Sequence, residues 1–409
     1  MDRHGDGPAH RAERRRHHRH LGQRQQQDLQ TVISASVKFI RSSDKGVPPA
    51  PRDWATFVAW IKGVFINGFN EVNVTRVAHQ TGELTLTLPD NHGFEQWQVL
   101  SLSGAADARF NVDMRVLRVR GQEVTCSVDN RLPPTTTGTM KVKQAPVGWE
   151  IAYENETVLV LHSKAPGGQY YFQFLKRGAQ QIEVRGAEGW TNGQPVNEWY
   201  RSASSTWSES WWGGLGRASA AWAVIGDDQL FYTLHGTGGV SLHPRDTAFT
   251  DRDFYLGAFG KFLAANPANP GHSVFSRTTY TTDSGWTNRL DFVWLLGKSV
   301  SSPTAVGSRD VRGAFQLGGQ GVEVWGAEPA SSDADFPLAV QNGFVISPTY
   351  VSSAGGMWGQ WPGLYRGSRY PAGQVVTGVP GMDGHAFLPV VTGSYGAHRW
   401  FFDITGPWR

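Results

Sequence analysis

Cysteine and long apolar runs are scarce in this 409-residue sequence. The single cysteine, Cys126, excludes an intrachain disulfide and a zinc site built from cysteines. It stands in an alternating stretch at residues 124–128, so we interpret it as a small apolar strand residue rather than a reactive thiol. No run of about 18 apolar residues occurs, and we therefore expect no membrane-spanning helix.

A basic excess is missing from the body of the chain, although the whole sequence carries a net charge of +3. Residues 1–30 hold seven arginines and four acidic residues, which accounts for the whole +3. The other residues hold 31 basic and 31 acidic side chains, so they offer no net charge to a phosphate backbone. We expect no nucleic-acid binding except through residues 1–30.

Residues 1–30 have almost no apolar side chains, and we expect the segment to be disordered in isolation. Three interpretations stay open: an electrostatic arm for nucleic acid or an acidic partner, an inert tail, or a start site assigned too early. The segment also lacks the apolar stretch of a secretory signal. We therefore expect a soluble protein made in the cytoplasm.

Charged residues make up only 18% of the chain, whereas glycine contributes 49 residues and tryptophan 17. Abundant Gly, Trp, Thr and Val with few Lys, Glu and Leu favours strands joined by tight turns. We predict a mainly β protein, and its length predicts at least two domains.

One amphipathic helix is predicted within residues 31–70, after a strand at residues 32–40. Three prolines between residues 48 and 51 interrupt regular structure, and Asp53 follows as an N-cap. Apolar residues then recur at helical spacing up to the stop signal Asn67-Gly68. We expect the helix to be anchored against a sheet or another subunit by Trp54, Phe57, Val58, Ile61 and Phe65.

Residues 71–148 change to a period of two, which predicts a small antiparallel β-barrel or sandwich. The turns Gln80-Thr-Gly82 and Arg120-Gly-Gln122 predict hairpins. Strands are expected at residues 72–77, 83–88, 98–102, 115–119, 123–128 and 138–142.

Residues 149–409 are longer and less regular, and we predict a larger, loop-rich all-β domain there. We interpret the stretches at residues 205–216 and 353–367 as loops, because they hold too many glycines and aromatic side chains for helices. Strands are expected at residues 157–162, 169–175, 180–185, 221–225, 229–234, 253–258, 290–296, 343–346 and 399–404.

Catalytic and metal-binding motifs are missing as well, so we expect neither an enzyme nor a cofactor or metal site. The sequence has no phosphate-binding loop, no HExxH zinc motif, no GxSxG nucleophile elbow and no EF-hand loop. Histidines outside the first 30 residues are scattered. His235 and His243 could converge in a β fold, but we interpret them as isolated or satisfied side chains.

Two carbohydrate alternatives stay open. A glycoside hydrolase needs two carboxyls about 5 to 9.5 Å apart; Glu188, Glu198 and Glu209 lie in an aromatic region, with Asp227-Asp228 nearby. Carbohydrate binding without cleavage would use exposed tryptophan faces, whereas the plainer alternative places these tryptophans in a core or a subunit interface. The tryptophans concerned are Trp207, Trp211, Trp212, Trp358 and Trp361.

The order of several short motifs resembles a family of virion structural proteins from tailed bacteriophages and prophages. The strand and polar loop FIRSSDKGVP precede the helix WATFVAWIKGVFINGFN, which ends in Asn-Gly-Phe. The segment NHGFEQWQVLSLSGAADARFN follows, then TGTMKVKQAPVGWE, and the chain closes on DITGPW. The resemblance covers residues 32–409 and leaves out the basic start.

This resemblance implies a non-enzymatic part of a phage particle, in the tail or baseplate region rather than the capsid shell. It brings no catalytic residues and no cofactor to the chain. It implies a virion location, assembly with other virion proteins and a homo-oligomer, because virion parts are symmetric. A glycan-binding or glycan-cleaving β-protein that acts in host recognition remains the alternative.

Overall fold

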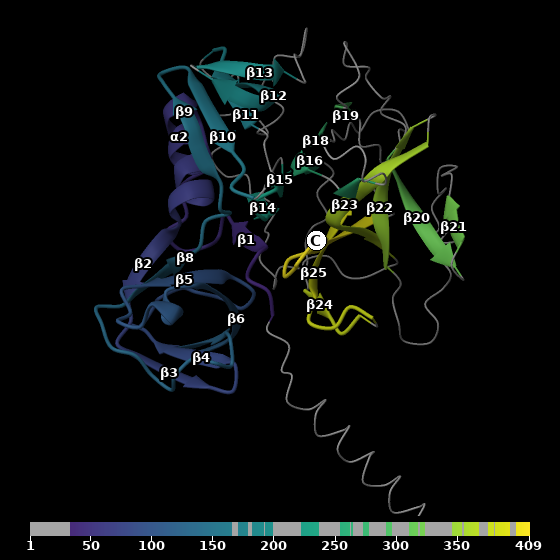
Figure 1. Ribbon diagram of the computed structural model, residues 1–409. Coiled ribbons are helices and arrows are strands. Elements are labelled where there is room, and N and C mark those ends of the chain that lie inside the picture. Colours follow the sequence, from purple (N-terminus) through teal and green to yellow (C-terminus); the bar gives the residue numbers. More distant parts are fainter. Residues whose placement is uncertain are drawn as a thin grey trace, which may run out of the picture.

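The computed structural model shows the mainly β fold that the composition predicts, with a single helical segment of several turns near the N-terminus of the part it describes (Figure 1). The basic segment at residues 1–30 lies outside the described residues. The structure describes residues 33–165, 171–178, 182–191, 193–198, 222–236, 254–261, 263–264, 273–277, 292–296, 311–317, 320–323, 346–353, 356–367, 375–379, 381–392 and 398–409.

The helix forms where the sequence predicts it. Helix α2 spans Trp54–Ile61 and continues as the π-helix η1 at Lys62–Asn67. Asp53 caps its start: the Asp53 side chain accepts the Thr56 backbone N–H, and the Thr56 hydroxyl accepts the Asp53 backbone N–H. Gly68 ends the segment with a φ of 72°, a backbone conformation that favours glycine.

The five predicted anchor residues all pack against the core, four of them buried and Val58 half-buried. Trp60 and Val64 are buried as well, although the prediction left them out. They share a face with Phe57 and Ile61, because residues three, four and seven positions apart lie on one side of a helix. The buried stripe is therefore wider than predicted, and aromatic rings dominate it.

Residues 69–144 form one antiparallel sheet of seven strands with its own apolar core. Its order is β2-β8-β5-β6-β7-β4-β3, so the two strands of this sheet that come first in the sequence, β2 and β3, lie at opposite edges. The edge strands do not pair with each other, so within these residues the sheet does not close into a barrel. The strands are β2 (Phe69–Asn73), β3 (Arg76–Gln80), β4 (Glu83–Thr87), β5 (Val99–Ser103), β6 (Asp113–Arg120), β7 (Glu123–Ser127) and β8 (Lys141–Gln144), with a 3-10 turn, η2, at Ala108–Phe110.

The single strand predicted at residues 72–77 is wrong. The Val74 N–H donates to Met140 O at 2.9 Å, and the Thr75 N–H donates to Thr87 O at 3.0 Å. These two residues therefore carry the chain from one edge of the sheet to the other. Thr75 and Arg76 are both polar, so the alternation is interrupted at the crossing, but one irregular position does not by itself distinguish a change of partner from a bulge within a single strand.

Both predicted hairpin turns are confirmed. Strands β3 and β4 pair across Thr81-Gly82, whose φ angles are 50° and 75°. Positive φ at both central residues is what a type I′ turn requires, and it matches the twist of the flanking strands. Strands β6 and β7 pair across Gly121-Gln122, where Gly121 has a φ of 58°.

The other strands form three further antiparallel sheets. One has the order β1-β14-β15-β16-β18-β19, a second β13-β12-β11-β10-β9, and a third β21-β20-β22-β23-β26-β25-β24 with β17 paired to β23. In the first two the strands are β1 (Lys38–Arg41), β9 (Glu150–Glu154), β10 (Val158–His162), β11 (Tyr171–Lys176), β12 (Ile182–Thr191), β13 (Gln194–Glu198), β14 (Trp222–Gly226), β15 (Leu230–Gly236), β16 (Phe254–Lys261), β18 (Ser273–Arg277) and β19 (Phe292–Leu296). In the third they are β17 (Leu263–Ala264), β20 (Val311–Leu317), β21 (Gln320–Glu323), β22 (Ile346–Ser353), β23 (Gly356–Gly367), β24 (Val376–Thr377), β25 (Ala386–Thr392) and β26 (His398–Asp403).

Two predictions about strand positions need correction. The strand predicted at residues 32–40 is only β1, because residues 33–37 take a non-strand path. The loop predicted at residues 353–367 is mostly strand β23, in which Trp361 is buried. The other strands predicted after residue 149 each overlap an observed strand.

Helix α2 and η1 pack between the five-stranded and six-stranded sheets. The Phe57 and Phe174 rings meet edge to face at 5.2 Å, and the Trp60 and Trp222 rings do so at 5.3 Å. Figure 1 shows the helix above the seven-stranded sheet, with the C-terminal strands on the other side of the molecule. None of the helices in the described residues is long and apolar enough to cross a membrane.

Candidate functional site

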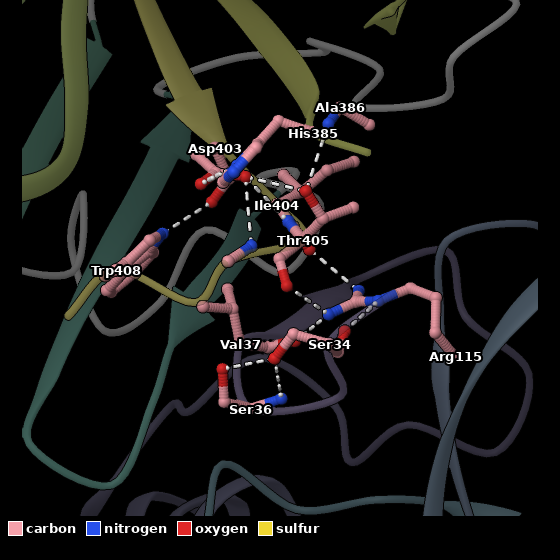
Figure 2. A network of polar contacts seen from close by, with 11 residues as sticks. Ser34, Ser36, Val37, Arg115, His385, Ala386, Asp403, Ile404, Thr405 and Trp408 are labelled. Carbon is pink, nitrogen blue, oxygen red and sulfur yellow. Dashed lines mark hydrogen bonds and ion pairs between the residues drawn. The ribbon is translucent and has the colours of Figure 1, made fainter. Parts of the chain in front are cut away.

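Arg115 lies on strand β6 and has no exposed surface, although it is a charged residue. Its neighbours Met114 and Val116 belong to the core of the seven-stranded sheet, so Arg115 leaves that sheet on the opposite face. Figure 2 shows its guanidinium pointing into a junction between residues 34–37 and residues 404–405. Both ends of the described chain therefore meet at this one side chain.

Every N–H group of this guanidinium donates a hydrogen bond to a backbone carbonyl. Nε donates to Ser34 O at 3.0 Å, Nη1 to Trp97 O at 2.7 Å and Nη2 to Val37 O at 2.5 Å. The two remaining N–H groups reach the C-terminal segment, Nη1 to Ile404 O at 2.7 Å and Nη2 to Thr405 O at 3.0 Å. Because a guanidinium has five N–H groups, none is left for a ligand.

Burial lowers the pKa of Arg115 to about 9, and the negative charge of Asp403 opposes this shift. The guanidinium is therefore still charged at neutral pH. Carbonyl dipoles, rather than a carboxylate in direct contact, compensate most of its charge.

Asp403, at the end of β26, organises the C-terminal segment and has a side chain only 1% exposed. Its Oδ1 accepts the Thr405 N–H at 2.9 Å, the Thr405 hydroxyl at 2.8 Å and the Gly406 N–H at 3.0 Å. Its Oδ2 lies 2.8 Å from His385 Nδ1, and its carbonyl accepts the Trp408 indole N–H at 3.0 Å. One carboxylate thus fixes the turn whose carbonyls bind Arg115.

We call residues 403–409 the C-terminal clasp, because this segment touches several sheets. The Trp408 ring packs against Tyr232 on β15, with ring centroids 5.6 Å apart. Gly363 on β23 makes room for that ring: a Cβ there would lie 2.2 Å from its atoms. Beyond it, Arg409 donates from Nη2 to the carbonyl of β16 at Lys261, at 2.7 Å.

A second buried arginine, Arg41 at the end of β1, binds side chains instead of carbonyls. Asp44 accepts its Nε at 3.0 Å, and Glu95 accepts its Nη2 at 2.7 Å. Gln144 on β8 donates to the same Asp44 at 2.8 Å. Burial acts to lower the pKa of Arg41, but Asp44 and Glu95 outweigh it and the net shift is upward. This group joins β1 to the seven-stranded sheet.

Both arginine centres are built for holding segments together. Their polar atoms bind one another and the backbone. Among the residues that the structure describes, no group of three or more His, Cys, Asp or Glu side chains could hold a metal ion. Cys126 is buried, and burial raises the pKa of its thiol, which suits the packing role predicted for it.

The structure describes the side chain of one of the five predicted tryptophans. Trp361 is fully buried and packs against Tyr232 with ring centroids 6.1 Å apart, so it offers no open face to a sugar. Trp358 lies on β23, and its side chain is outside the described part. Trp207, Trp211 and Trp212 lie outside the described residues altogether.

Among the acidic candidates, the structure describes the side chains of Asp227 and Asp228. Glu188 and Glu198 lie on β12 and β13, which the structure describes only as backbone at these positions, and Glu209 lies outside the described residues. Asp227 is buried in a turn: its Oδ1 accepts the N–H groups of Gln229 and Leu230, and burial raises its pKa. Its role there is to fix the β14–β15 turn.

The two histidines considered together from the sequence, His235 and His243, lie partly outside the part of the chain that the structure describes. His235 is a residue of β15 whose side chain is outside the described part, and His243 lies outside the described residues.

Sequence reasoning missed Arg115 and Asp403 as a connected group. Arg115 stands in the same alternating strand as Arg118 and Arg120, and no local feature separates it from those exposed residues. Asp403 belongs to the DITGPW motif on which the family resemblance partly rests, which is the only sequence signal that pointed to this segment.

Comparison with known proteins shows no family for this chain. No protein-family model matches the chain, and no curated protein matches it either. Among solved structures, the chain is similar to the phage phi92 endosialidase at 11% sequence identity and a TM-score of 0.16. The match covers 82% of this chain and 52% of the endosialidase chain, so this chain spans about half the length of that protein. A likeness at this TM-score carries no argument about fold or activity.

Proposed function

We propose that this protein is a non-enzymatic structural component of a tailed-phage virion, in the tail or baseplate region. It acts by assembling with copies of itself and with other virion proteins. One observation carries the proposal: the motif residues on which the family resemblance rests hold turns and junctions of the fold. Motif residues that maintain the fold suit a protein whose role is to provide a defined shape. A component of a phage particle has such a role.

The glycines of these motifs stand where a side chain does not fit. A Cβ on Gly104 of the SGA motif would lie 2.2 Å from Thr139 O, and one on Gly138 of the TGT motif would lie 2.2 Å from Gly104 O. A Cβ on Gly68, after the helix, would lie 2.3 Å from Gln144 O. Three separate motifs therefore use glycine for close contact between chain segments.

The polar and aromatic motif residues are also engaged inside the protein. His92 of the HGF motif is 5% exposed; its Nδ1 accepts the Phe94 N–H at 3.0 Å, and its Nε2 lies 3.0 Å from Gly121 O. Trp149 of the GWE motif donates its indole N–H to Asp227 O at 2.9 Å. With both ring nitrogens of His92 occupied, this histidine is a structural residue.

Mass spectrometry of purified particles tests the virion assignment. The protein is expected in phage or induced prophage particles purified on a density gradient, co-migrating with other tail proteins. Its presence in the cell lysate but not in such particles would contradict the proposal. Light scattering of the isolated protein tests self-assembly, and a strictly monomeric species at high concentration would count against the homo-oligomer.

The carbohydrate alternative is weakened by Trp361. It is the one tryptophan of the predicted set whose side chain the structure describes, and it is part of the core. A glycan array with the full-length protein separates the two functions, since a structural component alone is expected to bind no glycan.

A further inference from the structure

His385 is partly exposed to water, whereas the carboxylate that it pairs with is buried. Its side chain is 22% exposed, whereas that of its partner Asp403 is 1% exposed. His385 Nδ1 and Asp403 Oδ2 lie 2.8 Å apart (Figure 2). The imidazole can therefore exchange a proton with water, while the Asp403 carboxylate that interacts with its charge stays buried.

The surroundings of His385 leave Asp403 as its main electrostatic partner. The His385 ring stacks on Phe387 at 6.2 Å, and its backbone N–H donates to Met382 O at 3.1 Å. Among the described residues, Asp403 is the charged group in direct contact with it. The charge of Arg115 acts on the same carboxylate from the other side of residues 404–405.

We propose that the C-terminal clasp is a pH-sensitive lock: protonated His385 holds it closed through Asp403, and loss of that proton loosens it. Neutral His385 can keep the hydrogen bond from Nδ1–H, so the part that disappears is the attraction between the two charges. The clasp then depends on the hydrogen bonds that the Asp403 carboxylate accepts from backbone N–H groups and on Trp408 packing.

The direction of the pH effect follows from the pKa shift. The hydrogen bond to Asp403 raises the pKa of His385, and the charge of Asp403 adds to the rise while partial burial opposes it. A raised pKa means that the folded state holds the proton more tightly than the unfolded chain does. The extra stability is therefore fully present below about pH 6.5, the ordinary histidine value, and is lost as the pH rises through the raised value.

Loosening the clasp also affects the junction at Arg115. The carbonyls of Ile404 and Thr405 are two of the five acceptors of the guanidinium. When residues 404–405 move, Arg115 stays charged in a buried site with fewer acceptors, which is unfavourable. One proton on the surface is thus coupled to the contact between the seven-stranded sheet and the C-terminal strands.

Hydrogen–deuterium exchange of the full-length protein tests the lock. The amides of Ile404, Thr405 and Gly406 are hydrogen-bonded in the closed clasp, so they report its opening. After correction for the intrinsic pH dependence of exchange, their protection is expected to fall roughly two- to fivefold between pH 6 and pH 9, the range that a partly exposed ion pair gives.

Two variants separate the lock from general alkaline destabilisation. His385→Asn keeps a neutral donor near the position of Nδ1, so its clasp amides are expected to show the same protection at all pH values in this range. His162→Asn is the matched control: His162 also pairs with a carboxylate, Glu150 at 2.8 Å, but on another sheet, and the wild-type profile should persist.

Constant protection in the wild type overturns the lock, and so does a fall of the same size in His385→Asn. If His385→Asn does not fold, exchange at the imidazole carbon of His385 in the wild type gives its titration directly. A midpoint at or below the ordinary histidine value would then overturn the lock.

Discussion

The Arg115 guanidinium donates a hydrogen bond to the carbonyl oxygen of Ile404, 289 residues further along the chain, at 2.7 Å. The same guanidinium binds the carbonyls of Ser34 and Val37, close to the beginning of the described chain. A single side chain on β6 thus ties both ends of the protein to the seven-stranded sheet. The consequences of this arrangement for stability can be measured directly.

Replacing Arg115 with alanine is expected to cost about 3 kcal/mol or more of unfolding free energy, because five buried carbonyls lose their donor. Urea denaturation measures this. Arg118→Ala is the control on the same strand: Arg118 forms a partly exposed ion pair with Glu83, worth about 1 kcal/mol or less. Equal losses in the two variants would show that the junction is not a stability determinant. If Arg115→Ala does not fold, Arg115→Lys keeps the charge but has fewer donors, and an intermediate loss is expected.

Thr405→Val tests the hydrogen bonds of the C-terminal clasp. The Thr405 hydroxyl donates to Asp403 at 2.8 Å and accepts the Ala386 N–H at 3.0 Å. Valine has nearly the same shape but leaves the Ala386 N–H buried without a partner, which costs about 1 to 3 kcal/mol. Thr405→Ser retains the hydroxyl and is expected to lose less. Thermal melts of both variants decide the point, and the reverse ranking would be incompatible with it.

Gly363→Ala tests the seat of Trp408. The new Cβ would lie 2.2 Å from the indole ring, and the φ of 69° is also unfavourable for alanine. Gly378 has a similar φ of 71° but nothing within 4 Å, so Gly378→Ala measures the backbone effect alone. We expect Gly363→Ala to be worse by about 1 to 3 kcal/mol, the usual cost of overpacking. Denaturation curves that coincide would mean that the ring moves aside freely.

Phe57→Ala tests the anchoring role of helix α2. Phe57 is fully buried and meets Phe174 of the five-stranded sheet, so truncation is expected to cost about 3 to 5 kcal/mol. Val58→Ala, the next residue on the same helix, changes a half-buried side chain and should cost about 1 kcal/mol. Chemical denaturation compares the two. A larger loss in Val58→Ala would place the anchoring face elsewhere.

Local patterns predicted the elements that depend on neighbouring residues. The helix at Trp54–Ile61 was predictable because a cap, an apolar face and a glycine stop lie within one short stretch. The hairpin at Thr81-Gly82 was predictable because its turn chemistry is local too. In both cases the residues that decide the structure are close together in the sequence.

Local sequence patterns did not predict which distant segments pair with each other. Alternation predicted a continuous strand at residues 72–77, but the choice of partners at Val74 and Thr75 splits it. Strand β23 lies in the stretch predicted as a loop, because its many glycines and aromatic side chains are evidence only against a helix. Glycine suits position 363 because the ring of Trp408, 45 residues further along the chain, occupies the space that a Cβ would need.

The mainly β class, the capped helix and the packing role of Cys126 follow from local sequence, because composition, periodicity and turn residues act over a few positions. The burial of Arg115, in contrast to the exposed Arg118 on the same strand, depends on how distant segments pack. A charge can be buried only where acceptors surround it, and the acceptors of Arg115 come from residues as far away as Thr405. Where those carbonyls meet is a property of the folded chain.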